Sequence, residues 1–169
     1  FLLPILKVLN FKPKVLESLR PKPFPSKLKK GIEFRNVTFY YPKSKKPALK
    51  NINFFIKPEE SIALVGENGS GKTTLIKLLS RLYDVTSGEI LIDGINIKDY
   101  SLDDLYSNIG VIFQDFMKYE ALIEENIRFG RLSTKNYKSK VHESALKAGA
   151  WNFIKELEKK YKTPLGKKI

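Results

Sequence analysis

Cysteine is absent from the 169-residue sequence, and histidine occurs once, as His142. The absence of cysteine excludes disulfide bonds, thiol catalysis and cysteine-ligated zinc or iron–sulfur sites. A single histidine likewise excludes a histidine-rich metal site. No apolar run reaches the roughly 20 residues that a membrane-spanning helix needs. The content of 42% hydrophobic and 12% aromatic residues is enough for one packed domain.

Acidic residues are also few, with 18 Asp and Glu against 31 Lys and Arg, which gives a formal charge of +13. The excess is concentrated at the two ends: residues 1–31 hold eight Lys or Arg and one Glu, and the last fifteen hold six Lys and two Glu. A lysine-rich solvated surface is the simplest interpretation, and an anionic membrane surface is the main alternative. We expect no nucleic-acid partner, because no RNA-binding aromatic signature or helix-turn-helix pattern is visible.

The N-terminal 31 residues differ from the rest of the chain in composition and in the pattern of apolar residues. Residues 1–19 have an apolar pattern interrupted by two prolines, which predicts an amphipathic or broken helix. Residues 20–31 are rich in Pro and Lys and predict an extended linker. We therefore place a domain boundary near Lys30, followed by one domain over residues 32–169.

From residue 32 onwards the pattern predicts strands first and helices later. Alternating apolar and polar residues, or short apolar runs between turn residues, indicate strands. The expected strands are 32–41, 51–57, 61–65, 87–94 and 109–113, and the runs 61–65 and 109–113 are expected to be buried. Ser101 is expected to cap a helix over 101–108, and apolar residues at helical spacing predict helices after about residue 122.

One motif carries chemistry. The segment from Gly66 to Thr73, GENGSGKT, matches G-x-x-x-x-G-K-[ST] at every fixed position, after an apolar strand pattern and before a helical one. Glycines allow the backbone N–H groups to turn around a phosphate, and the helix that follows adds the positive end of its dipole. Lys72 supplies a cation for the outer phosphates, and Thr73 supplies a hydroxyl for Mg²⁺. The guanine-reading motif of GTPases does not occur.

The sequence on both sides of this motif resembles that of a known protein family. From IEFRNVTFYYPK through IGVIFQD and EENI to GAWNFIKEL, residues 32–169 resemble the nucleotide-binding domain of ATP-binding cassette (ABC) transporters. The lead-in over residues 1–31 is similar to the cytoplasmic linker that follows the last membrane helix of exporter-type half-transporters. The resemblance implies an α/β fold: a P-loop NTPase core with an antiparallel β subdomain and the start of an α-helical subdomain.

The resemblance also implies roles for individual residues. Tyr41 matches the aromatic residue that stacks on adenine, with Tyr40 as the alternative in register. Gln114 matches the glutamine that contacts Mg²⁺ and the attacking water, so Thr73 and Gln114 are the expected metal contacts. The expected ATP-binding residues are Tyr41, Gly66, Glu67, Asn68, Gly69, Ser70, Gly71, Lys72, Thr73, Thr74 and Gln114.

Several other residues are expected to lie outside the site. Residues 87–89 match a structural turn, and the apolar run that ends at Asp93 matches a peripheral strand rather than a magnesium-holding one. His142 is expected on the surface of a charged helix. Leu122-Ile123 stands where exporters usually have Thr-Ile before ENI, which is a departure in the coupling region.

The function implied is ATP binding and, in the intact protein, ATP hydrolysis coupled to export across a membrane. The implied cofactors are ATP and Mg²⁺. The implied partners are a transmembrane domain and a second nucleotide-binding domain, identical or different, at the cytoplasmic face of the cell membrane. The family's signature, Walker B aspartate, catalytic glutamate and switch histidine would follow Ile169, so the chain alone is expected to be inactive. The alternatives are an ATP-binding module without hydrolysis and a soluble ABC ATPase unconnected with transport.

Overall fold

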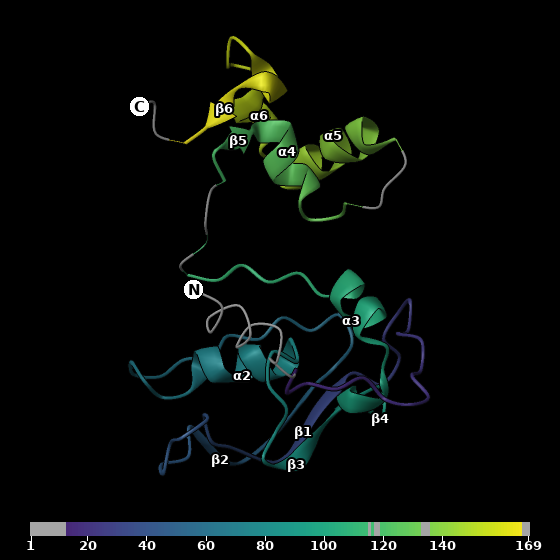
Figure 1. The fold of residues 1–169 in the computed structure, drawn as a ribbon, viewed down its shortest axis with the longest axis vertical. Helices are drawn as coiled ribbons and strands as arrows, with labels where there is room; N and C mark the ends of the chain where they lie inside the picture. The colour runs from purple at the N-terminus through teal and green to yellow at the C-terminus, as the bar shows by residue number, and fades with distance from the viewer. Residues whose placement is uncertain (1–12, 115, 117–118, 133–135, 167–169) are drawn as a thin grey trace, which may run out of the picture. The chain divides into compact units, whose positions relative to one another are not determined.

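The computed structural model describes residues 13–114, 116, 119–132 and 136–166. The chain divides into two compact units, Phe1–Val111 and Ile112–Ile169 (Figure 1). The first unit contains β1 (Ile32–Phe39), β2 (Leu49–Ile56), α2 (Lys72–Leu79), β3 (Ser87–Ile92), β4 (Ile95–Asn96), η1 (Ile97–Asp99) and α3 (Leu102–Asn108). The second contains β5 (Ala121–Leu122), α4 (Ile123–Arg128), α5 (Tyr137–Lys147), α6 (Trp151–Ile154), η2 (Lys160–Lys162) and β6 (Pro164–Leu165). Within the described ranges, no helix has the length and apolar character of a membrane span.

An antiparallel sheet forms the first unit, with strand order β2-β1-β3-β4. β1 pairs on both sides, so that Phe34 lies opposite Phe54 of β2 and opposite Ile90 of β3. These strands confirm the ones predicted near residues 32–41, 51–57 and 87–94. Residues 87–89 belong to β3 itself rather than to a turn before it.

One face of this sheet packs against α2 (Figure 1). Phe34, Val37 and Phe39 of β1 are buried together with Leu78 of α2. The rings of Phe34 and Phe54 stack with their centroids 4.3 Å apart. Strict alternation would put Phe34 and Val37 on opposite faces, and the register shift between them lets both side chains join the core that α2 covers. This packing holds α2, which begins at the end of the glycine-rich loop, against the sheet.

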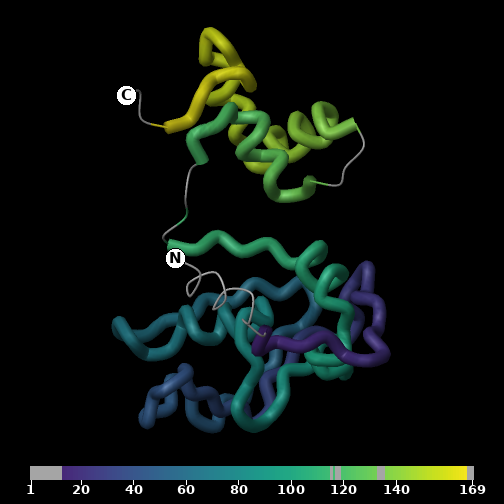
Figure 2. Tube along the Cα trace, in the orientation of Figure 1, coloured from purple at the N-terminus to yellow at the C-terminus, as the bar shows by residue number. Residues whose placement is uncertain are grey.

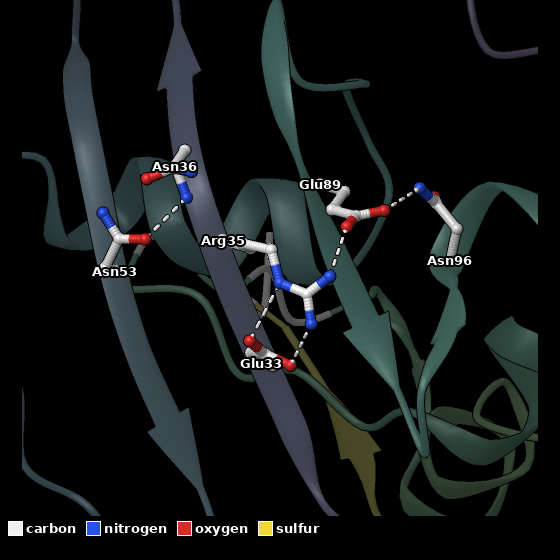
Figure 3. Close-up of polar contacts among 6 residues, drawn as sticks. All are labelled: Glu33, Arg35, Asn36, Asn53, Glu89 and Asn96. Carbon is white, nitrogen blue, oxygen red and sulfur yellow. Dashed lines mark hydrogen bonds and ion pairs between the residues drawn. The ribbon is translucent and has the colours of Figure 1, made fainter.

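The other face of the sheet is polar (Figure 3). Arg35 forms ion pairs with Glu33 at 2.9 Å and with Glu89 of β3 at 2.8 Å. The backbone N–H of Asn36 donates to the Asn53 side chain at 2.8 Å, which ties β1 to β2 where their register shifts. The sheet therefore has one face for a core and one for solvent.

The N-terminal segment, residues 13–31, lies along the first unit, as the purple part of the tube in Figure 2 shows. Residues 1–12 of the predicted helix lie outside the described residues, and residues 13–19 form no helix. In a helix, the carbonyl of Leu16 would accept from an amide of the following turn. Here it accepts from Nη2 of Arg81 at 2.7 Å instead. The Arg81 side chain that donates this bond is fully buried. The helix prediction is therefore wrong for residues 13–19, where no helix is formed.

The same segment is bound further along the chain. Lys22 donates its N–H to Asp99 O at 2.7 Å and accepts from Ser101 N at 2.9 Å. The ring of Phe24 packs on that of Tyr100, with centroids 5.2 Å apart. Residues 22–24 therefore behave as a short extended piece beside residues 99–101.

Two apolar runs differ from their predicted state. No strand is formed at 61–65 or 109–113, and the side chains of Val65 and Ile112 are 94% and 91% exposed. A strand is stabilised by its ladder to a neighbour, and none of the described strands pairs with either run. The prediction of a buried strand is therefore wrong for both runs.

The cap of α3 confirms its prediction. Ser101 Oγ accepts from the N–H of Asp104 at 3.4 Å, and the helix runs from Leu102 to Asn108. Serine is a favoured N-cap because its hydroxyl satisfies an amide that has no partner within the helix.

The second unit is mainly helical, as predicted after residue 122. Its core contains Ile123 of α4, Ala145 of α5 and Ile154 of α6. His142 was expected on the surface and is partly buried: its Nδ1 lies 2.8 Å from the hydroxyl of Tyr161, and its ring packs edge-on against Trp151. An imidazole is small enough to enter such an aromatic cluster, and its polar atom is satisfied there by the tyrosine.

Candidate functional site

The glycine-rich loop lies between residue 66 and α2, in the first unit. Gly69 and Gly71 have φ values of 84° and 96°, a region that disfavours other residues. A Cβ at Gly71 would lie 2.6 Å from Leu49 Cδ2 and 2.9 Å from the Ala48 carbonyl oxygen. Gly71 is therefore required both by its backbone conformation and by close contact with the start of β2.

Lys72 extends back over this loop. Its Nζ donates to the carbonyl oxygens of Gly66 and Glu67 at 2.7 and 2.8 Å, and lies 3.3 Å from Ser70 Oγ. The loop thus curls around an ammonium group, and backbone carbonyls hold that group in place. These acceptors use all three donors of the ammonium group, so a phosphate oxygen that binds Lys72 takes the place of one of them.

The first turn of α2 adds further donors. The N-cap is Gly71, which provides no side-chain cap, and the first turn contains no acidic residue. The amides of Lys72, Thr73 and Thr74 start the helix and have no partner four residues earlier within it. A charged anion is stabilised at such an end by these N–H groups and by the helix dipole.

The two threonines of the loop differ in environment. Thr73 is exposed, whereas Thr74 is buried, with its hydroxyl 3.1 Å from that of Tyr41. Thr73 can therefore present its hydroxyl to a metal-bound phosphate, and Thr74 links the helix to the chain after β1. The structure thus brings Tyr41 and residues 66–74 together within one unit.

Tyr41 lies in an aromatic cluster beside α2. Its ring packs edge-on against Phe39 at 4.9 Å and Tyr83 at 5.4 Å, and the ammonium of Lys77 is 5.8 Å from its centroid. Tyr40 has no such link to α2 among the contacts of the described residues, and its backbone N–H donates to Thr86 Oγ1 at 3.1 Å. Of the two register alternatives, Tyr41 is the one connected to the glycine-rich loop. Its stacking on a base stays a prediction.

Gln114 is exposed and belongs to the second unit. Its predicted contact with a metal and a water stays a prediction. In the described part of the chain, no group of three or more His, Asp or Glu side chains is arranged to hold a metal ion.

Asp93 has a structural environment that the sequence pattern did not reveal. Its carboxylate accepts from the N–H groups of Lys29, Lys30 and Gly31, at 2.8 to 3.0 Å. Burial alone would raise the pKa of Asp93, but the hydrogen bonds from Gly31, Lys29 and Lys30 outweigh it and hold the pKa below its ordinary value. Asp93 therefore anchors the N-terminal segment to the turn after β3.

The structural role of Asn126 was also not predicted from the sequence. Its side chain accepts from Tyr119 N at 3.0 Å and donates to the carbonyl oxygens of Tyr119, Ala121 and Leu122 at 3.1 to 3.3 Å. The Glu125 carboxylate accepts from Leu122 N at 2.8 Å, which caps α4. The adjacent Glu and Asn at the start of a short helix were the available signal. The ENI sequence thus shapes the backbone before α4.

Comparisons with known proteins point to one family. A family model described as "ABC transporter" matches residues 49–167. The subtilin transport ATP-binding protein SpaT of Bacillus subtilis is 48% identical over 113 residues, which cover 67% of this chain and 18% of that protein. The ATP-dependent lipid A-core flippase of Blochmanniella floridana is 41% identical over 141 residues, which cover 83% of this chain and 24% of that protein.

A solved structure is similar over nearly the whole chain. It is a bacterial Atm1-family ABC exporter with ATP bound, with a TM-score of 0.84 and 27% identity. The match covers 97% of this chain and 28% of the exporter chain. The chain therefore spans about a quarter or less of the length of the relatives that it matches, and slightly more of the exporter.

Proposed function

The chain belongs to the ABC transporter family, and from this we propose that it is the ATP-binding region of an ABC exporter. The observation that carries the proposal is the placement of Lys72 Nζ over the curled loop of residues 66–70, at the start of α2. In a protein of its relatives' length, this region would couple ATP binding and hydrolysis to the export of a substrate.

ATP, when bound with Mg²⁺, supplies the energy-rich phosphate bond whose hydrolysis drives transport. The residues of this chain would bind and orient it. The loop of residues 66–74 would receive the phosphates, Lys72 would neutralise their charge, and Thr73 would contact the metal. Tyr41 would stack on adenine, and Gln114 would contact Mg²⁺ and orient a water through its amide.

The partners follow from the same proposal. The relatives are named as transport proteins, a flippase and an exporter. We infer a transmembrane domain, which residues 1–31 would join to residues 32–169, and a second nucleotide-binding domain of identical or different sequence. The region would then lie at the cytoplasmic face of the cell membrane.

ATP affinity of a Lys72→Ala variant tests the proposal. Equilibrium dialysis with radiolabelled ATP and Mg²⁺ should show affinity reduced by at least roughly tenfold, because a charged partner of the phosphates is lost. The matched control is Lys57→Ala, which removes the same charge from an exposed lysine after β2. Equal ATP affinity in both variants, or no ATP binding by the unmodified chain, would contradict the proposal.

A further inference from the structure

A pocket in the second unit carries charge that the proposed nucleotide site does not use. It lies between α4 and α5, which contact each other directly (Figure 1), and has a volume of about 450 Å³. This size is within the range of small-molecule sites. The charges of its lining residues indicate what it could bind.

The single carboxylate of the lining is already neutralised by its own helix. Glu143 accepts from Lys140 at 2.7 Å and from Lys147 at 2.8 Å. The side-chain hydrogen bonds from Lys140 and Lys147 lower the pKa of Glu143 to about 2. Glu143 is thus ionised at neutral pH, and its negative charge is shared by two lysines.

Two arginines of the pocket are left without such a partner. No ion pair in the described ranges involves Arg128 or Arg131. The guanidinium carbon of Arg128 lies 4.4 Å from the centre of the Tyr137 ring, across the boundary between α4 and α5. This cation–π contact holds the planar donor group against the pocket wall. Among the described residues, the lining has four cations and one anion.

The remaining lining is partly apolar. Ile127 and the buried Val141 provide hydrocarbon surface, and Ser144 and Tyr137 add hydroxyl groups. A ligand that fits these features has an anionic head for the arginines and a short apolar part. Guanidinium groups match the geometry of phosphate oxygens particularly well.

We propose that this pocket, built by Arg128, Arg131 and Tyr137, binds a phosphate-bearing ligand with a short apolar portion. The phosphate belongs either to a phospholipid headgroup or to a soluble phosphate ester. The site does not depend on the proposed ATP binding, because no residue of the glycine-rich loop contributes to it.

The test uses the full 169-residue chain labelled with ¹⁵N. Glycerol 3-phosphate is titrated while the amide signals of Tyr137 and Ser144 are followed, and flotation with phosphatidylglycerol vesicles is measured in parallel. The variant Arg128→Gln/Arg131→Gln is compared with Lys138→Gln/Lys159→Gln, which loses the same charge from exposed lysines outside the pocket. Both variants alter exposed side chains, and circular dichroism checks their folding.

We expect saturable binding that the arginine variant weakens by at least roughly tenfold, while the lysine control and Lys72→Ala keep it. Saturable shifts with glycerol 3-phosphate identify the soluble ester as a ligand, and binding to vesicles alone identifies the headgroup. Equal losses in the arginine and lysine variants would show attraction by net charge only and overturn the proposal. Absence of binding to both probes would overturn it as well.

Discussion

The strands β1 and β3 and the apolar run 61–65 are similar in sequence and opposite in state. All are rich in β-branched and aliphatic residues, yet Val37 and Ile90 are buried whereas Val65 is 94% exposed. β1 has a paired strand on each side, and the run 61–65 has none among the described strands. A β-branched and aliphatic composition thus does not suffice for a buried strand, because such a segment also needs a neighbouring strand with which to pair.

The glycine-rich loop follows an unpaired run and is nevertheless well formed. Its contacts are local: Lys72 bonds to carbonyl groups six and five residues earlier, and Gly71 packs against the start of β2. These contacts hold the loop without any strand pairing of the run that precedes it. The contrast between the paired strands of the sheet and the unpaired run 61–65 can be tested by mutation.

The largest effect is expected from the core of the sheet. Phe34→Ala should lower the free energy of unfolding by about 3–5 kcal/mol, because it leaves a cavity beside the stacked Phe54. Val65→Ala is the matched variant in the unpaired run and should change it by less than about 0.5 kcal/mol. Urea unfolding measures both. A loss for Val65→Ala comparable to that for Phe34→Ala would show that the run is buried after all.

Much of the first unit could be predicted, for physical reasons that differ from residue to residue. The alternation around Phe34, the cap Ser101 and the loop before Lys72 are local patterns, and each was found where expected. Asp93 and Arg81 could not be assigned, because their partners at residues 29–31 and Leu16 are more than sixty positions away in sequence. Such pairings depend on the folded backbone, and no periodicity encodes them.

A smaller effect is expected at the start of β1. Gly31 has φ 110°, and a Cβ there would meet the Ile56 carbonyl oxygen of the paired strand β2. Gly31→Ala should therefore lower the free energy of unfolding by at least about 2 kcal/mol. Gly69→Ala has a similar backbone penalty but open space around its Cβ, so its cost should be nearer about 1 kcal/mol. If urea unfolding shows equal decreases in the free energy of unfolding for the two variants, the unfavourable backbone conformation alone, and not the close contact with β2, determines the destabilisation.

The smallest effect concerns the turn after β3 and depends on pH. The pKa of Asp93 is lowered in the folded state, so the ionised carboxylate stabilises the fold above its ordinary pKa of 3.8. This contribution is lost as the pH falls through the lowered folded value, because the unfolded state then binds more protons. The stability difference between the wild type and Asp93→Asn should thus be constant at neutral pH and shrink below about pH 4.

The comparison variant for this measurement is Asp103→Asn, which removes an exposed carboxylate from the first turn of α3. Asp103 has no contact with residues 29–31 among the described hydrogen bonds, so its removal should leave the N-terminal segment bound. Protection of the Lys30 and Gly31 amides from hydrogen exchange separates the two cases, since only Asp93→Asn deprives them of an ionised acceptor. Unchanged protection in Asp93→Asn would mean that packing of Phe24 on Tyr100, and not the carboxylate, holds the segment to the sheet.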